Sequence, residues 1–382
     1  MGGRVANLAL AAASLAVAVL VAEGLVRLLS PIGPALLVTD PAVGKRYRPG
    51  FAGRVFVDEA EGEVALRINA LGFRGPEWPR RKPAGGLRVA VLGDSMTAAV
   101  ATDGERTFVG RLEAALEADA RRPVEVANFG VASASTGSEL VTWRGVVAEL
   151  DPDLVLLAFF TGNDLADNSR QLTRAARPYF DVDGGGRLHQ VEDAVPTPAL
   201  VRWLDRHSRL YVWQKVAFRR MRAAGRQASS GIEPGQRIFA RGGDPAVEHA
   251  WRVTEALLLR LRDEVEANGA RFAVVVIPCA EQVDDAQWGD LARRGREAGL
   301  ELDRGEPSRR LAAILGREGV PALDLTPAFV EAAREGPGGA ASAAGLYLLG
   351  RFHLSDEGHR VAAQEILSFL RGEDGRRLLA PR

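Results

Sequence analysis

Five short apolar stretches constrain the fold of this chain more than any other feature. They are "LRVAVLG" (87–93), "VEVANFG" (124–130), "DLVLLAFF" (153–160), "RFAVVVIP" (271–278) and the shorter "PALDL" (321–325). An apolar run of this length without alternation is typical of a strand that is buried on both faces. The chain is therefore predicted to contain five strands of one buried sheet.

Helical patterns separate these stretches. We expect helices from Thr107 to about 118, over 138–150, after the Asp244-Pro245 pair, over 308–317 with Ser308 as the cap, and over 356–371. Strands that alternate with helices predict parallel pairing through right-handed crossovers. The fold class that follows is a doubly wound α/β sheet with helices on both faces, which binds its ligands at the carboxyl ends of the strands.

The N-terminus differs from the rest of the chain. Val5 to Ala22 is a run of eighteen uncharged residues, near the lower end of the ~20 residues that a membrane span needs. A cleaved signal peptide is one interpretation, since Ala16-Val17-Ala18 has suitable spacing, although it lies inside the apolar run. We favour an uncleaved signal anchor that crosses the membrane through residues 5–26, including Glu23. The rest of the chain would then lie outside the cytoplasm, at the cell membrane.

Composition excludes some partners and chemistries. The chain has 49 Lys and Arg against 49 Asp and Glu, so nothing indicates a nucleic-acid partner. Cys279 is the single cysteine, which rules out an internal disulfide. Because no histidine lies near it in the sequence, Cys279 is not expected to be a catalytic thiol.

The pattern suggests four segments. Residues 1–29 form the anchor, 30–86 a linker with a small β-rich lead-in, and 87–372 the main domain, with an insertion at about 165–243 that shows no clear strand period. We expect this insertion to shape the rim of a pocket. Its aromatic residues either stack on sugars or form a satellite core; they are Tyr179, Phe180, Trp203, Tyr211 and Trp213.

Three residues with chemical potential follow three successive strands. Ser95 in "GDS" follows the first, Gly130 ends the second, and Asn163 in "TGND" follows the third. Backbone N–H groups at Ser95 and Gly130, together with the Asn163 amide, could hold a negatively charged oxygen. Each residue alone also has an ordinary explanation, as a capping serine, a tight turn or a capping asparagine.

A histidine is needed beside such a serine. His353 lies in "RFHLSDEGH" just before the last predicted helix, and histidine is the usual general base because its pKa lies near neutrality. His359 is the rival, but it falls inside the helix. We therefore prefer His353.

These blocks in this order resemble the SGNH, or GDSL-like, hydrolase superfamily. The resemblance rests on "GDSMT", "NFG", "GND" and "FHLSDEGH", covers roughly 87–371, and leaves the insertion outside. "RINALGFRGPEW", "VVIPCAEQV" and the apolar N-terminus are similar to a membrane-anchored bacterial branch. The resemblance implies a three-layer α/β/α flavodoxin-like sandwich and the hydrolysis or transfer of acyl esters, often acetyl groups on carbohydrate.

The chain departs from the family at the third catalytic position. The family usually has an aspartate two or three residues before the histidine, where this chain has Arg351 and Gly350. Asp356 and Asp324 are weak substitutes, and a backbone carbonyl is another way to hold the ring.

We therefore expect a serine esterase that acts on an acetyl or other short-chain acyl ester. Ser95 attacks, His353 transfers the proton, and Ser95, Gly130 and Asn163 hold the oxyanion. This chemistry needs no metal or organic cofactor. Two alternatives stay open: a polysaccharide O-acetyltransferase, and a catalytically inactive glycan-binding module, which the absent aspartate motivates.

Overall fold

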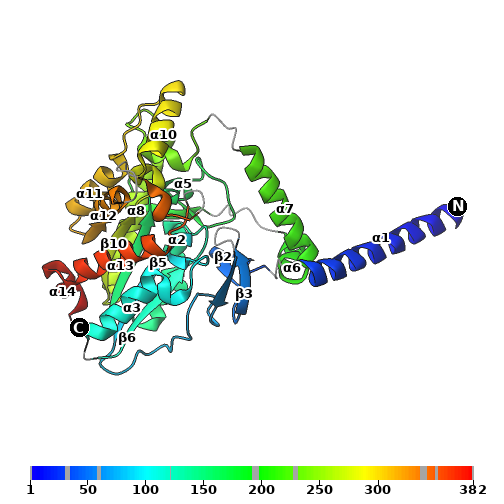
Figure 1. Ribbon diagram of the computed structural model, residues 1–382, viewed down its shortest axis with the longest axis horizontal. Helices are drawn as coiled ribbons and strands as arrows, with labels where there is room; N and C mark the ends of the chain where they lie inside the picture. Colours follow the sequence, from blue (N-terminus) through cyan, green and yellow to red (C-terminus); the bar gives the residue numbers. More distant parts are fainter. Residues whose placement is uncertain are drawn as a thin grey trace. The chain divides into compact units, whose positions relative to one another are not determined.

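The computed structural model describes most of the chain (Figure 1). The described residues are 2–30, 35–57, 62–120, 122–191, 198–226, 231–335, 342–348 and 352–380. The chain divides into two compact units. One comprises 1–39 and 197–229, and the other comprises 40–196 and 230–382.

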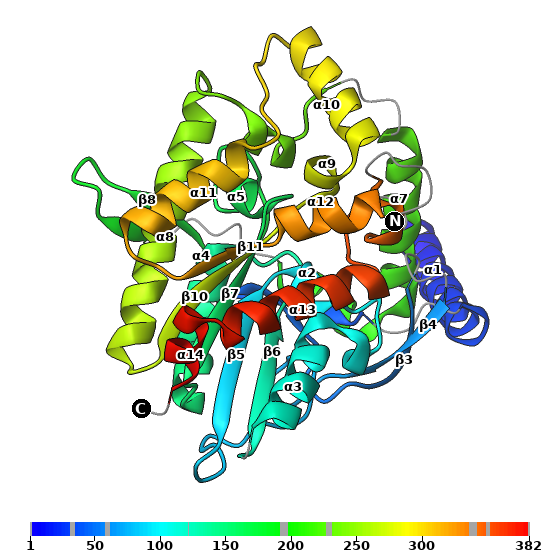
Figure 2. The same cartoon turned by 60° about the vertical axis from the view of Figure 1, so that its left-hand side comes forward.

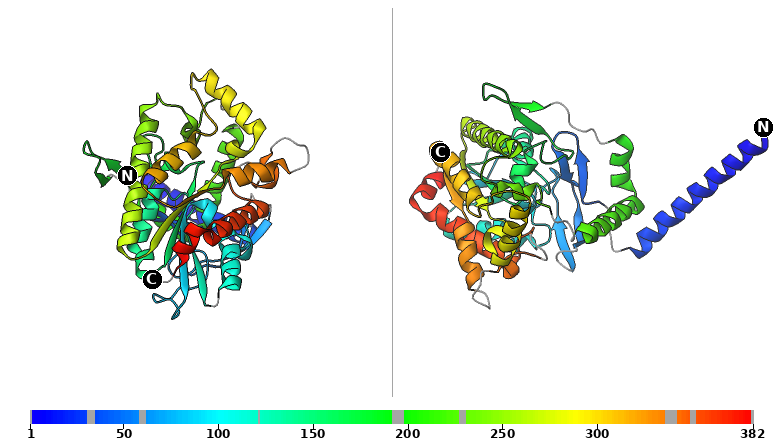
Figure 3. Two further views of the ribbon diagram at one scale, coloured as in Figure 1. Left: turned by 90° about the vertical axis from the view of Figure 1, so that its left-hand side faces the viewer. Right: turned by 90° about the horizontal axis from the view of Figure 1, so that it is seen from above.

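The smaller unit consists of three helices, which are α1 (Gly2–Leu29), α6 (Ala199–His207) and α7 (Arg209–Arg226). The apolar helix expected at the N-terminus is present and is longer than predicted. Its segment Arg4–Leu29 has a mean hydropathy of 2.3, and none of it is buried. Within this unit α7 packs against α1 and α6, as the right panel of Figure 3 shows.

The larger unit is built around the predicted five-stranded parallel sheet. Its strands are β5 (Leu87–Gly93), β6 (Val124–Gly130), β7 (Leu154–Phe160), β10 (Arg271–Ile277) and β11 (Ala322–Asp324). Their order is β11-β10-β7-β5-β6. The chain order thus reverses between β5 and β7, and in open α/β sheets ligands bind at such a switch point. Register pairs Gly93 with Gly130, so the carboxyl ends of β5 and β6 lie level.

Helices cover both faces of this sheet. On one face, α3 (Phe108–Asp119) packs on β6 and on α13 (Asp356–Arg371), and both helices lie in front of the strands in Figure 2. On the other face, α8 (Pro245–Ala267) packs on β10 and on α4 (Thr136–Gly145). The α/β fold class predicted from the sequence is confirmed.

Helix starts were predicted less well than strands. Thr107 and Asp244 cap α3 and α8 as expected. The Ser308 cap was wrong, because α11 (Glu306–Arg317) begins after Gly305 and places Ser308 in its first turn. The α4 helix starts two residues before the predicted Ser138, because the Ser135 hydroxyl accepts the capping hydrogen bond.

The predicted insertion at 165–243 contains regular structure. It holds a hairpin of β8 (Tyr179–Val182) and β9 (Leu188–Val191), as well as α6 and α7. Strands of four residues are too short to show an alternating pattern in the sequence. Tyr179 and Phe180 are buried, which fits a satellite core rather than a sugar platform.

The remaining elements complete the description. They are β1 (Leu37–Asp40), β2 (Gly44–Tyr47), the antiparallel pair β3 (Ala52–Val57) and β4 (Gly62–Arg67), α2 (Ser95–Ala98), α5 (Asp164–Asp167), α9 (Ala280–Val283), α10 (Asp285–Glu297), α12 (Thr326–Arg334) and α14 (Glu373–Leu379).

Candidate active site

Ser95 is the first residue of α2, the short helix that follows β5. Strand and helix meet closely, since a Cβ on Gly93 would lie 2.2 Å from Thr97 Oγ1. Asp94 caps α2 by accepting a hydrogen bond from the Met96 N–H (2.8 Å). Ser95 is half-buried, so its hydroxyl lies at the end of the sheet without being enclosed.

Gly130 lies where β6 passes α2. A Cβ at this position would be 2.3 Å from the Ala98 nitrogen, so only glycine allows this approach. The Gly130 N–H donates to Asn128 Oδ1 (2.9 Å). The Gly130 N–H was expected to donate to an oxyanion, but here it already donates to Asn128. It could donate to an oxyanion only if the Asn128 side chain turned away.

The loop after β6 contains a residue that the sequence analysis missed. Ser133 has a φ of 65°, a left-handed conformation that is uncommon outside glycine. Its hydroxyl accepts a hydrogen bond from Lys45 (3.2 Å). Strained residues of this kind cluster at functional sites, so Ser133 joins the candidate residues.

Asn163 follows β7, the strand next to β5 in the sheet. Its Nδ2 donates to Asp167 Oδ2 (2.9 Å), and Asp167 is also paired with Arg177 (2.7 Å). A Cβ on Gly162 would lie 2.4 Å from the Phe160 ring, so glycine is needed to start this turn. The Asn163 amide is thus oriented by a buried ion pair.

Asp94 connects the predicted site residues. Burial raises the pKa of this carboxyl to about 6, while the positive charge of His353 and the Asn163 side chain both lower it. Asp94 also precedes Ser95 in the sequence. One buried carboxyl therefore adjoins the serine and interacts with both His353 and Asn163.

The rival histidine has a structural role. His359 is buried, its Nδ1 accepts a hydrogen bond from the Phe108 N–H (3.2 Å), and its ring stacks on Phe108. Burial lowers the pKa of His359 to about 3. A ring that is enclosed and already hydrogen-bonded is unsuited to act as a general base.

The two weak candidates for the acid each have hydrogen-bond partners elsewhere in the structure. Asp356 is held by Arg106 and Arg111, and the hydrogen bond from Arg106 lowers its pKa to about 2. Asp324 caps α12 by accepting from the Thr326 N–H (2.8 Å). The expected aspartate positions, Gly350 and Arg351, lie outside the described residues.

Two further carboxyls lie buried near Asp94, and no pattern in the sequence indicates them. Glu139 on α4 and Asp164 on α5 are buried, and burial raises the pKa of each well above its ordinary value, with the charge of Asp94 adding to the effect. Neither carboxyl oxygen of Glu139 accepts a hydrogen bond from any described residue. Such groups are stable as neutral acids.

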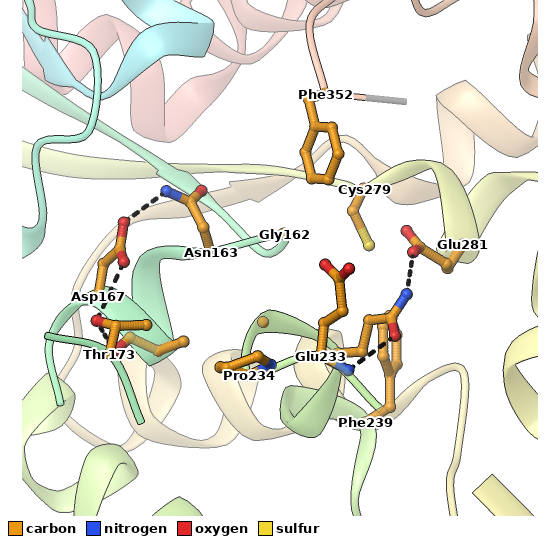
Figure 4. A pocket seen from close by; sticks show the side chains of 13 residues that line it. Gly162, Asn163, Asp167, Thr173, Glu233, Pro234, Phe239, Cys279, Glu281 and Phe352 are labelled. Carbon is orange, nitrogen blue, oxygen red and sulfur yellow. Dashed lines mark hydrogen bonds between the residues drawn. The ribbon is translucent and has the colours of Figure 1, made fainter. Parts of the chain in front are cut away.

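A cavity of about 180 Å³ opens beside Asn163 (Figure 4). Glu233 and Glu281 are part of its wall, with Phe352 across from them. Glu281 accepts a hydrogen bond from Gln236 (2.9 Å). Cys279 also lines the cavity, but burial raises the pKa of its thiol, so it stays protonated and is a poor nucleophile.

Comparison with protein families gives a match over most of the chain. The model of the GDSL-like Lipase/Acylhydrolase family matches residues 91–361. The chain belongs to this family. The match runs from β5, which precedes Ser95, into α13, which follows His353, so the five-stranded sheet of this GDSL-like protein is the family's domain.

Solved structures show distant similarity. An acetylxylan esterase from Geobacillus stearothermophilus is 15% identical, with 78% of this chain and 97% of that chain covered and a TM-score of 0.40. LAE5, an α/β hydrolase from the metagenome of Lake Arreo, is 15% identical; the match covers 77% of this chain and 97% of LAE5, with a TM-score of 0.41. A putative lipolytic G-D-S-L protein from Desulfitobacterium hafniense is 12% identical, with 74% and 98% covered and a TM-score of 0.36. Comparison with functionally curated proteins gave no significant match.

Proposed function

We propose that this chain is a serine ester hydrolase with Ser95 as nucleophile and His353 as general base. The observation that carries the proposal is the environment of Asp94. This carboxyl precedes Ser95 in the chain; burial raises its pKa to about 6, and the charge of His353 and the Asn163 side chain partly offset that rise. Three residues from separate parts of the sequence thus share one neighbour, as a catalytic site requires.

The proposed reaction proceeds through an acyl-serine. Ser95 Oγ attacks the ester carbonyl carbon as its proton passes to His353, and the carbonyl electrons move onto oxygen. Asn163 Nδ2 turns from Asp167 to donate to this oxyanion, together with backbone N–H groups at the start of α2. The C–O bond to the alcohol then breaks, and His353 protonates the leaving oxygen. Water, deprotonated by His353, releases the acyl group in the same way.

Asp94 is proposed to stabilise the imidazolium that forms at His353. With a pKa of about 6, this carboxyl is largely ionised at pH 7 and above. A negative charge in a buried site interacts more strongly than one in water. This arrangement supplies the electrostatic part of the role that an aspartate before the histidine has elsewhere in the family.

The cavity supports a small acyl ester on a neutral, hydroxyl-bearing alcohol such as a sugar. It measures about 180 Å³ and lies beside Asn163, so we infer that the acyl group it takes is short. Glu233 and Glu281 present acceptors for hydroxyl donors and repel anions, and Phe352 offers an aromatic face. Acetyl groups on a neutral carbohydrate meet these conditions.

Hydrolysis of p-nitrophenyl esters by the full-length chain tests the catalytic residues. We expect turnover of the acetyl ester, little turnover of the palmitoyl ester, and loss of activity in S95A and H353Q. S368A, on the exposed side of α13, and H359Q are the matched controls and keep activity. Unchanged turnover in purified S95A would overturn the assignment, and acetyl transfer to sugars in preference to water would make the protein an acyltransferase.

The alcohol is tested with acetylated sugars of different charge. We expect acetylated xylose to be preferred over acetylated glucuronic acid, because the two carboxylates repel the anion. E233Q and E281Q should weaken that preference without abolishing turnover. An equal rate on both sugars in the unmodified protein would exclude this account of the cavity.

We also propose that α1 is an uncleaved, single-pass anchor with the larger unit outside the cytoplasm. The support is its hydropathy, the absence of buried residues between Arg4 and Leu29, and the hydrogen bonds from α7 to Glu23, which a leader removed by cleavage would not retain. N-terminal sequencing of the membrane-extracted protein, with protease protection in spheroplasts, checks both points. A mature N-terminus after Ala18 would refute it.

A further inference from the structure

The helices α6 and α7 of the smaller unit carry large apolar side chains that are exposed. Five large apolar side chains on them are 42–66% exposed, and they are Leu200, Trp203, Trp213, Phe218 and Met221. On α6 the positions 200, 203, 204 and 207 share one face, and on α7 the positions 210, 213, 217, 218 and 221 do so. Each helix therefore presents an apolar face at helical spacing.

The polar sides of the two helices pair with each other. Asp205 on α6 is buried and accepts from Lys215 on α7 (2.5 Å). Because this ion pair joins the helices through their polar residues, the apolar faces are left outward. Ordinary core packing would have the reverse arrangement.

Glu23 joins these helices to the end of α1. Its carboxylate accepts from the Ser208 hydroxyl (2.8 Å) and from the Arg209 and Leu210 N–H groups (2.8 and 3.0 Å). These are the first residues of α7, where N–H groups have no partner within the helix. The carboxylate that interrupts the apolar N-terminus is thus the cap of a helix 185 residues away. Arg27 adds a hydrogen bond to the His207 carbonyl (2.9 Å).

Charge separates this segment from the rest of the protein. Residues 199–226 contain eight Lys or Arg residues and one Asp, whereas the whole chain has no net charge. A helix with Trp and other large apolar residues on one face and basic residues on the other lies in the interface of a bilayer. Tryptophan is enriched at that depth, and Lys and Arg are attracted to anionic lipid headgroups.

We propose that α6 and α7 lie on the surface of an anionic lipid bilayer, with Leu200, Trp203, Trp213, Phe218 and Met221 inserted among the lipids. The bilayer is favoured over a protein partner because α7 begins with hydrogen bonds to Glu23, near the end of the one described helix that is long and apolar enough to span a membrane. The inference rests on the anchor role proposed for α1, and it assigns a second contact with the same membrane.

Spin-label accessibility in nanodiscs tests this proposal with the full-length chain. Single cysteines replace Leu200, Phe218, Arg206 on the polar side, or Leu15 within α1. Because native Cys279 is buried, the label goes to the introduced thiol. Collision with oxygen reports lipid, and collision with a water-soluble nickel chelate reports water. We expect the oxygen-to-nickel ratio at 200 and 218 to exceed that at 206 several-fold, and to rise when phosphatidylglycerol is added to phosphatidylcholine.

The outcomes separate the two membrane proposals. If the label at position 15 contacts lipid while the labels at positions 200 and 218 contact water, the surface contact of α6 and α7 is overturned and the anchor role of α1 is retained. Protection of 200 and 218 from both reagents indicates a protein partner and also overturns it. Lipid exposure at 200 and 218 with water exposure at 15 supports the surface contact and overturns the anchor. Water exposure at all three sites overturns both.

Discussion

Substituting Gly130 by alanine tests how tightly the sheet holds Ser95, the proposed nucleophile. The added Cβ would lie 2.3 Å from the Ala98 nitrogen and 2.7 Å from Thr97 Cβ, whereas ordinary contact begins at 3.4 Å. The helix α2 must therefore move by roughly 1 Å, and Ser95 moves with it. Overpacking of this kind costs about 1–3 kcal/mol of unfolding free energy. A misplacement of about 1 Å at a catalytic group costs on the order of 10²-fold in rate.

This substitution separates two roles of the glycine, because alanine keeps the backbone N–H and removes only the space. The measurements are denaturant unfolding and kcat/KM on p-nitrophenyl acetate. G145A on α4 is the matched control, since nothing lies within 4 Å of its added Cβ. If G130A stays within about 0.5 kcal/mol of the parent, as surface substitutions do, and retains its rate, the steric argument is wrong.

Three further predictions concern the buried and paired groups around the site. H359Q should keep esterase activity. Folding lowers the pKa of His359 from 6.5 to about 3, so the free energy of unfolding of the parent should fall by about 1.4 kcal/mol for each pH unit between pH 6.5 and 3. The variant should not show this loss. E139Q should be more stable than the parent, and the difference in the free energy of unfolding should grow as pH rises above 4.5. The reason is that the pKa of Glu139 is raised in the folded state, so its carboxyl ionises more readily in the unfolded chain and the parent loses stability as pH rises. Melting curves between pH 4 and 8 check this. D356N should retain kcat and lose at most about 1 kcal/mol of stability, since Asp356 is partly exposed and pairs with Arg106 and Arg111. A large fall in kcat in this variant would indicate that Asp356 takes part in catalysis.

The strands could be predicted closely because burial on both faces leaves an unambiguous pattern. The bounds of β5 and β6 match the predicted runs, and those of β7 and β10 differ by one residue. Helix starts depend on which of several adjacent polar residues accepts the capping hydrogen bond. Ser135 does so for α4, so the helix begins before the predicted start at Ser138, and packing decides between such neighbours.

The α6–α7 segment was not predicted because its apolar faces contribute little to the core. The sequence offered aromatic residues and a basic run, which are equally typical of a solvated helix. Glu23 counted against a membrane helix when taken alone, and its partners at Ser208 and Leu210 are too distant in the sequence to be inferred from spacing.

The site illustrates the same limit. The positions of Ser95 and Asn163 directly after β5 and β7 could be predicted because strand ends in a parallel sheet converge, and that argument needs only the order of elements; their catalytic roles stay predictions. The environment of Asp94 could not, because it depends on how α4 and α5 pack Glu139 and Asp164 against it. That packing has a consequence for catalysis. With Glu139 and Asp164 neutral, Asp94 is the group in this cluster that ionises near neutral pH, so a positive charge forming at His353 has one buried counter-charge close by. In the proposed mechanism, this buried negative charge stabilises the imidazolium although the chain has no aspartate two or three residues before His353.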